Sequence, residues 1–235
     1  NALFCDASYD PAWSPDGSRI AFSRRGTGEG LYVVEVDSGH VRKLTEGFGM
    51  PDSSPAWSPD GTRIVFERDL DFDGDSSHIY VMDADGGNVR QLTDGVGVED
   101  SSPAWSPDGS QIAFASNRDG DSDIYVMDVD GGNIRQLTNK PEPVWEYHPA
   151  WSPDGNQIAF ASSRDGDSDI YVMDVDGGNI RQLTDGPGID FHPAWSPGSM
   201  PVPPSQGPLI TSEPENPDTS ATSSSTSETL SKKSN

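Results

Sequence analysis

The sequence predicts an all-β protein of the β-propeller class, and a repeated string carries this prediction. Pro-Ala-Trp-Ser-Pro occurs five times, and its tryptophans are Trp13, Trp57, Trp105, Trp151 and Trp195. Consecutive tryptophans are separated by 44, 48, 46 and 44 residues, a period that fits one four-stranded propeller blade. The residues between them read as short strands separated by turns. We therefore expect four full blades and a partial fifth.

The third repeat shows how each unit gives four strands. Its first strand ends at Trp105, and residues 106–109 supply a turn because Pro presets φ and Gly closes the hairpin. Residues 112–115 alternate large with small side chains, which suits a sheet packed between two neighbouring sheets. Residues 124–127 favour a pleated, buried strand, and residues 134–138 are expected to form the outer strand.

The repeated string resembles the propeller repeat of TolB and related proteins, also known as the WD40-like or PD40 repeat. The string consists of Trp-Ser-Pro-Asp-Gly, then Ile-Ala-Phe, Ile-Tyr-Val-Met-Asp and Arg-Gln-Leu-Thr, and the resemblance covers about residues 8–197. It implies a propeller whose first strands line a central channel, and a periplasmic or extracellular location. The fifth repeat breaks at Pro197 and Gly198, so we expect a truncated or open ring.

Composition divides the chain into two regions. Residues 1–198 hold the propeller repeats, whereas 21 of the 37 residues in 199–235 are Ser, Thr or Pro, with no aromatic residue. Such a segment buries too little apolar surface to offset its ordering entropy, so we expect a disordered tail. An open arc of blades would leave strand edges exposed, which predicts self-association through those edges.

Charge and cysteine content exclude several classes of partner and site. The 39 acidic residues outnumber 15 Lys and Arg, which gives a net charge of -24 and disfavours binding to nucleic acid. Cys5 is the only cysteine, so no intrachain disulfide and no thiolate metal cluster can form. No apolar run reaches the length of a membrane span.

Two of the positions that precede each tryptophan vary from repeat to repeat, and both lie at the start of the innermost strand. Five residues before it stand Ser8, Asp52, Asp100, Glu146 and Asp190, and three before it stand Asp10, Ser54, Ser102, His148 and His192. These residues are expected to surround one mouth of the channel. The acids there, Asp52, Asp100, Glu146 and Asp190, suit a cation such as calcium. Alternatively, they cap neighbouring blades by accepting hydrogen bonds from backbone amides.

Aromatic residues accompany the two histidines of this expected rim. Trp145 and Tyr147 flank the fourth repeat, and Phe191 precedes His192 in the fifth. Aromatic rings with a few polar groups suit a sugar or a peptide, so Trp145, Tyr147, His148, Phe191 and His192 are candidate ligand-binding residues. The alternative is that these rings seal an exposed channel end.

A second candidate cation site lies in the loop between strands two and three of the second repeat. Its alternating carboxylates resemble the opening of a calcium loop and are Asp69, Asp71, Asp73 and Asp75. Tyr80 stands where an EF-hand places its bidentate Glu, which excludes an EF-hand. In repeats three and four the corresponding acids are predicted to be solvated turn residues or Asx caps: Asp119, Asp121, Asp123, Asp165, Asp167 and Asp169.

No catalytic signature is present: the sequence lacks Gly-x-Ser-x-Gly, His-Glu-x-x-His and a phosphate-binding glycine loop. We therefore predict a binding propeller that recognises a protein or carbohydrate ligand and is not an enzyme. One alternative is a metal-dependent lyase, because oligogalacturonate lyases resemble this repeat and bind metal through histidines, here His148 and His192. Another is the propeller part of a prolyl-oligopeptidase-like peptidase. The other histidines, His40 and His78, are expected to be surface structure.

Overall fold

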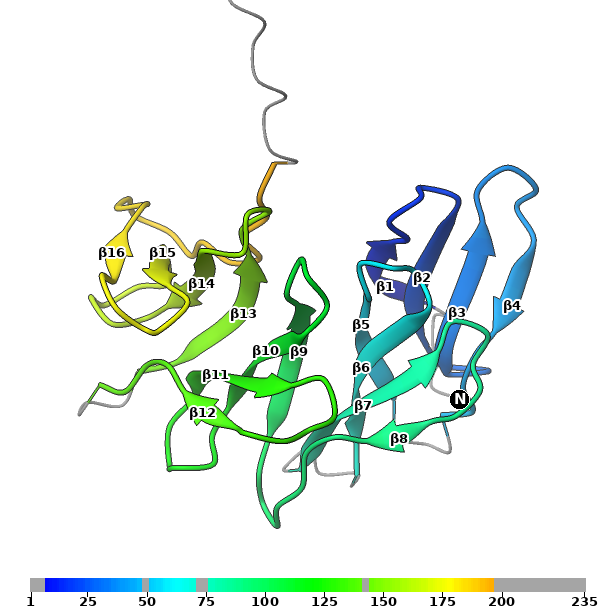
Figure 1. Ribbon diagram of the computed structural model, residues 1–235, viewed down its shortest axis with the longest axis horizontal. Coiled ribbons are helices and arrows are strands. Elements are labelled where there is room, and N and C mark those ends of the chain that lie inside the picture. The colour runs from blue at the N-terminus through cyan, green and yellow to red at the C-terminus, as the bar shows by residue number, and fades with distance from the viewer. Residues whose placement is uncertain (1–6, 48–50, 71–75, 141–143, 197–235) are drawn as a thin grey trace, which may run out of the picture. The chain divides into compact units, whose positions relative to one another are not determined.

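A computed structural model describes residues 7–47, 51–70, 76–140 and 144–196. The chain divides after Gly198 into two units, and every described residue belongs to the first. Within the described residues, sixteen strands form four antiparallel sheets of four strands, each built from consecutive strands of one repeat (Figure 1). No described segment forms a helix of the length and apolarity that a membrane span requires.

Each sheet, or blade, begins at a strand that carries the repeat's tryptophan. Blade 1 contains β1 (Ala7–Trp13), β2 (Arg19–Arg25), β3 (Gly30–Glu35) and β4 (Val41–Lys43). Blade 2 contains β5 (Asp52–Trp57), β6 (Arg63–Asp69), β7 (Ser77–Asp83) and β8 (Arg90–Gln91). Blade 3 contains β9 (Asp100–Trp105), β10 (Gln111–Ser116), β11 (Asp123–Asp128) and β12 (Arg135–Gln136). Blade 4 contains β13 (Glu146–Trp151), β14 (Gln157–Ser162), β15 (Asp169–Asp174) and β16 (Arg181–Gln182).

The turn that follows each tryptophan is held by side chains of the repeated string. In blade 3 the Ser106 hydroxyl donates to Asp108 Oδ1 at 2.6 Å, and the same oxygen accepts from the Ser110 amide at 3.0 Å. These hydrogen bonds hold the pKa of Asp108 below its usual range. Gly109 follows with φ of +72°, a left-handed conformation that glycine adopts without a Cβ clash. The string therefore fixes the hairpin between the first two strands.

The core lies between neighbouring sheets rather than inside any one of them. Blade 3 places its large side chains Ile112 and Phe114 against blade 2, whereas its small Ala113 and Ala115 receive Phe160 of blade 4. All five side chains are at most 1% exposed. The alternation of large and small residues thus lets one sheet pack on both faces, as the sequence predicts.

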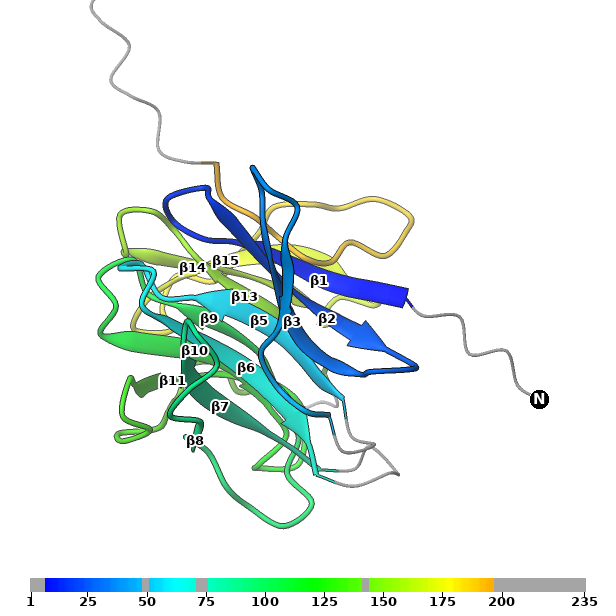
Figure 2. The same cartoon turned by 90° about the vertical axis from the view of Figure 1, so that its right-hand side faces the viewer.

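The tryptophans also connect each blade to the one before it. Their indole Nε1 groups donate to alanine carbonyls of the preceding repeat in four pairs: Trp57 to Ala12, Trp105 to Ala56, Trp151 to Ala104 and Trp195 to Ala150. The first strands β1, β5, β9 and β13 contact one another in this order, which runs from right to left in Figure 1. Figure 2 shows the same strands after a turn of 90°. The repeat period therefore sets which residues of successive blades meet.

The sequence-based prediction of an all-β fold with four four-stranded blades is confirmed. Two details differ from the expectation. The outer strand of blade 3 covers Arg135–Gln136 only, although the amides of Leu137 and Thr138 still donate to the Ile124 carbonyl of β11 at 2.8 and 3.4 Å. The described residues of the fifth repeat, 190–196, form no strand. Trp195 nevertheless donates to Ala150 at 3.0 Å, so this segment follows blade 4 as each blade follows its predecessor.

Candidate functional site

The residues three positions before the tryptophans come together around one cavity. Its volume is about 450 Å³. Its walls consist of Asp10, Ser54, Ser102, His148 and His192, each with the proline that follows it. The repeats thus place five different side chains at equivalent positions of one rim, which we call the rim cavity, as the sequence predicts for this position.

A local backbone distortion directs these five residues to the rim. Asp10, Ser54, Ser102, His148 and His192 all have φ between +50° and +59°, a left-handed conformation uncommon outside glycine. In each of the four blades, strand pairing is interrupted at this point by a bulge. Bulges redirect side chains beside functional sites, and strained φ values persist only where the surroundings enforce them.

Carboxylates connect the rim of the first three blades. Asp10 Oδ2 accepts from the Ser23 hydroxyl at 3.1 Å and from the Ser54 amide of the next blade at 3.4 Å. Glu67 Oε2 accepts from the Ser54 hydroxyl and from the Ser102 amide of the next blade, both at 3.4 Å. One carboxylate oxygen therefore lies at each of the first two junctions between blades.

Sequence reasoning did not select Glu67. The signal was available, because Ala115 and Ala161 occupy the equivalent position in repeats three and four. Burial, reinforced by the nearby charge of Asp69, raises the pKa of Glu67 to about 7. A carboxyl group whose proton equilibrium falls near neutrality therefore lies beside the rim cavity.

The opposite side of the rim is built from imidazole and aromatic rings. The centroids of His148 and His192 are 3.8 Å apart, and Tyr147 and Phe191 pack edge-on against them at 5.1 and 4.9 Å respectively. Burial and then the neighbouring His192 lower the pKa of His148 to about 4, although Asp10 opposes this shift. His148 is therefore neutral at pH 7.

Four of the five predicted ligand-binding residues thus form one cluster, and Trp145 lies apart from it. The Trp145 side chain is 67% exposed, while its backbone amide donates to Ser163 Oγ at 3.0 Å. Tyr147 is fixed by a 2.6 Å hydrogen bond between its hydroxyl and that of Ser168. Tyr147 is therefore held beside His148, whereas Phe191 is 54% exposed and Trp145 lies outside the cluster.

The acids five positions before the tryptophans lie inside the blades and do not line the rim cavity. Asp52 and Asp100 are fully buried and pair with Arg68 at 2.6 Å and Arg118 at 2.8 Å respectively. Glu146 pairs in the same way with Arg164. Asp190 differs because it is exposed, and its backbone amide donates to the Ser168 carbonyl at 2.6 Å. Three of these four predicted cation ligands therefore already have a cationic partner.

One histidine prediction is wrong. His78 was expected at the surface, yet it is 3% exposed, with Nδ1 2.7 Å from the Ser77 carbonyl and 3.7 Å from Asp100 Oδ2. The reason is that β7 lies within the sheet, so its first residues are covered by the next blade. His40 is exposed, as expected.

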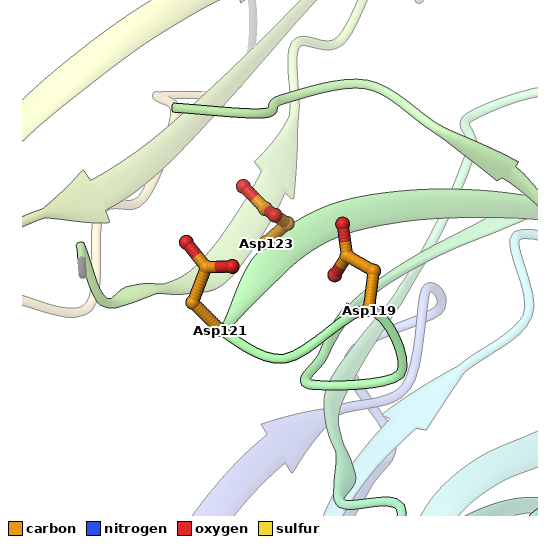
Figure 3. Close-up of side chains that lie close together, drawn as sticks. All are labelled: Asp119, Asp121 and Asp123. Carbon is orange, nitrogen blue, oxygen red and sulfur yellow. The ribbon is translucent and has the colours of Figure 1, made fainter. Parts of the chain in front are cut away.

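Three carboxylates in blade 3 lie close enough together to hold a metal ion. One ligand oxygen from each of Asp119, Asp121 and Asp123 falls within 4.8 Å of the others (Figure 3). Gln136 donates to both Asp119 and Asp123, and burial raises the pKa of Asp123 to about 7. The candidate ligands Asp71, Asp73 and Asp75 lie outside the described residues, whereas Asp69 is the last residue of β6.

Comparison with solved structures extends this description. The TolB structure from Agrobacterium tumefaciens is 32% identical, with a TM-score of 0.71 over 82% of this chain and 67% of that one. TolB from Acinetobacter baumannii is 27% identical, with a TM-score of 0.65 over 76% of this chain and 44% of that one. This chain therefore spans about two thirds of the first relative and less than half of the second.

A more distant match shows the fold alone. Oligogalacturonate lyase from Vibrio parahaemolyticus is 17% identical, with a TM-score of 0.58 over 75% of this chain and 53% of that one. No curated protein matches the chain. The family model of the TolB beta propeller domain matches three segments, residues 2–74, 70–146 and 141–202. These matches cover most of the sequence, and the chain belongs to the TolB β-propeller family of PD40 repeat proteins.

Proposed function

We propose that the chain is a non-catalytic binding propeller that recognises a protein or carbohydrate ligand at the rim cavity. The observation that carries this proposal is the rim itself. Five repeats use one strained backbone conformation to present an acid, two hydroxyls and two imidazoles around a shared volume. A purely structural rim would have no need of such chemical variety, because the scaffold around it is nearly identical in repeats three and four.

The chemistry of the rim suits a ligand with both polar and apolar groups. Tyr147 and Phe191 offer ring surfaces next to the histidine pair, and Asp10 offers a carboxylate across the cavity. Ligand sites of this kind combine apolar walls with a few placed polar groups. Exposed Trp145 adds an aromatic surface outside the cavity, of the type enriched at protein interfaces.

The proposal is tested by removing the aromatic wall. Wild-type protein is screened against a peptide display library and a glycan array, and each ligand found is titrated against Trp145→Ala/Tyr147→Ala/His148→Ala. We expect affinity to fall by at least about tenfold, which corresponds to ~1.4 kcal/mol. The matched control is Val89→Ala, at a side chain that is 43% exposed next to an outer strand. Unchanged affinity in the triple variant would contradict the proposal.

Calcium binding forms a finer part of the proposal. The cluster of Asp119, Asp121 and Asp123 supplies the hard oxygen ligands that calcium prefers. An ion that binds only the folded state stabilises that state by mass action, so calcium is expected to raise the melting temperature of the protein. Asp121→Asn should abolish the increase, and magnesium serves as the comparison ion. An equal increase in wild type and variant would place the calcium elsewhere.

The histidine pair favours one second candidate, a metal-dependent lyase acting on acidic sugars. The two rings lie 3.8 Å apart, His148 is neutral, and its buried Nδ1 has no hydrogen-bond partner among the described residues. Neutral imidazole nitrogens are common ligands of divalent transition metals. The assay is release of unsaturated products from oligogalacturonate before and after chelation. No turnover with any added divalent ion would eliminate this candidate.

A further inference from the structure

The junctions between blades are not equivalent at the rim, and the difference indicates how a ligand is held. At the first two junctions, Asp10 and Glu67 each direct a carboxylate oxygen at the backbone amide of the next rim residue. These amides belong to Ser54 and Ser102, and both distances are 3.4 Å. The protein thus provides its own oxygen acceptor for the rim amide in blades 2 and 3.

The next two junctions lack such an acceptor. Ala115 and Ala161 stand at the position of Glu67, and a methyl group accepts no hydrogen bond. His148 and His192 have the same left-handed φ as Ser54 and Ser102, so their amides occupy equivalent places on the rim. No side chain among the described residues accepts a hydrogen bond from either amide.

The backbone places both residues at the rim cavity, and the His192 amide donates to no backbone carbonyl among the described residues. His148 lies in the bulge of β13, between the paired residues Tyr147 and Ala150, and His192 lies outside any strand. Both residues line the rim cavity. His148 adds a buried Nδ1 without a partner. A polar group without a hydrogen-bond partner in a partly buried site destabilises the protein until a ligand or a water molecule forms the missing hydrogen bond.

We propose that oxygen atoms of the ligand accept hydrogen bonds from the amides of His148 and His192, one at each junction, in the positions that the Asp10 and Glu67 carboxylates fill at the first two junctions. This proposal rests on the proposed function, because it assigns the ligand of the same cavity. These oxygen atoms belong to uncharged amide groups of a polypeptide segment, either backbone carbonyls or Asn or Gln side chains.

Charge distinguishes an amide carbonyl from a carboxylate as the source of the oxygen. Asp10 lines the same cavity, and the protein carries a net charge of -24. A ligand carboxylate would be repelled by both. An amide carries no net charge, and it also has an N–H group. Asp10 Oδ1, the carboxylate oxygen not used by Ser23 and Ser54, can accept a hydrogen bond from that N–H group.

The decisive variant restores the missing acceptor. Ala161→Glu places a glutamate in repeat four at the position of Glu67. Its carboxylate is expected to accept the hydrogen bond of the His192 amide, so that this amide can no longer bind a ligand. Ala161→Met is the matched control for size, since its side chain has a similar length but no oxygen that could accept a hydrogen bond from the His192 amide. Thermal unfolding of each variant shows whether the blade still folds. Where Ala161→Glu unfolds, Ala115→Glu makes the same test at His148.

The probes are a capped tetra-alanine peptide and digalacturonate, titrated to millimolar concentration and followed by the amide signals of 15N-labelled protein. We expect the peptide to shift the His148 and His192 amides in wild type, digalacturonate to leave them in place, and Ala161→Glu to abolish the His192 shift. Peptide-induced shifts confined to other rim residues would overturn this inference but not the proposed function. Shifts caused by digalacturonate alone would also overturn it and favour the lyase.

Discussion

Replacing Arg118 with methionine is expected to destabilise blade 3 strongly, because it leaves a buried carboxylate without its partner. Asp100 is 0% exposed, and Arg118 Nη2 lies 2.8 Å from its Oδ1. Asp100 Oδ2 accepts no hydrogen bond from any described residue, and His78 Nδ1, 3.7 Å from it, compensates the charge only when the ring is protonated. Breaking a buried ion pair in this way costs about 3–5 kcal/mol. Methionine retains most of the contact with the Phe114 ring, which limits the loss of packing.

Chemical denaturation followed by tryptophan fluorescence measures this loss. For a domain of this size, about 3–5 kcal/mol corresponds to a fall in melting temperature of about 6–20 °C. The double variant Asp100→Asn/Arg118→Met removes the charge together with its partner. It should therefore lose only about 1–3 kcal/mol, the cost of an unsatisfied buried amide.

A surface arginine provides the control. Arg135 is exposed, and its guanidinium donates to backbone carbonyls of Val175 and Asp176 in the next blade. Arg135→Met is expected to cost less than about 1 kcal/mol, because exposed interactions contribute little. Equal losses for Arg118→Met and its double variant would refute the reasoning, since the buried charge would then not be the cause.

Three further predictions concern the scaffold and the rim. Trp105→Ala should cost about 3–5 kcal/mol, whereas Trp13→Ala should cost less than about 1 kcal/mol in urea unfolding, because the two side chains are 8% and 59% exposed. Gly131→Ala should destabilise more than Gly120→Ala, since a Cβ at the former would lie 2.6 Å from the Leu92 carbonyl oxygen and at the latter meets nothing within 4 Å. Burial raises the pKa of Glu67 from 4.5 to about 7, so the stability it contributes falls as pH rises through this range, by on the order of 3 kcal/mol. Glu67→Gln should flatten that part of the pH profile of thermal unfolding.

The fold could be predicted from the sequence because the relevant information is local and repeated. The Ser106 to Ser110 turn, the alternation of Ile112 and Ala113, and the tryptophan spacing each act within one repeat. Repetition then determines the contacts between blades, as the Trp105 to Ala56 hydrogen bond shows. Tertiary contacts therefore follow from the period, without long-range information.

The site was less predictable, because its chemistry depends on contacts between blades. The position of Asp10, Ser54 and Ser102 on the rim followed from the alignment of the repeats. The partner of Asp100 did not, because Arg118 lies 18 residues later in the sequence and its direction depends on the loop between β10 and β11. The role of Glu67 at the rim was not predicted, because a single acid in a strand forms no recognisable motif.

The most direct test of a ligand-binding rim cavity is a map of chemical-shift changes in 15N-labelled protein, with the tightest peptide selected from a display library. The proposed function predicts that the changes concentrate at Asp10, Ser54, Ser102, His148 and His192, which line the cavity. It also predicts little change at the outer strands β8, β12 and β16. Changes concentrated on those outer strands, with the rim amides unaffected, would contradict a binding role for the cavity.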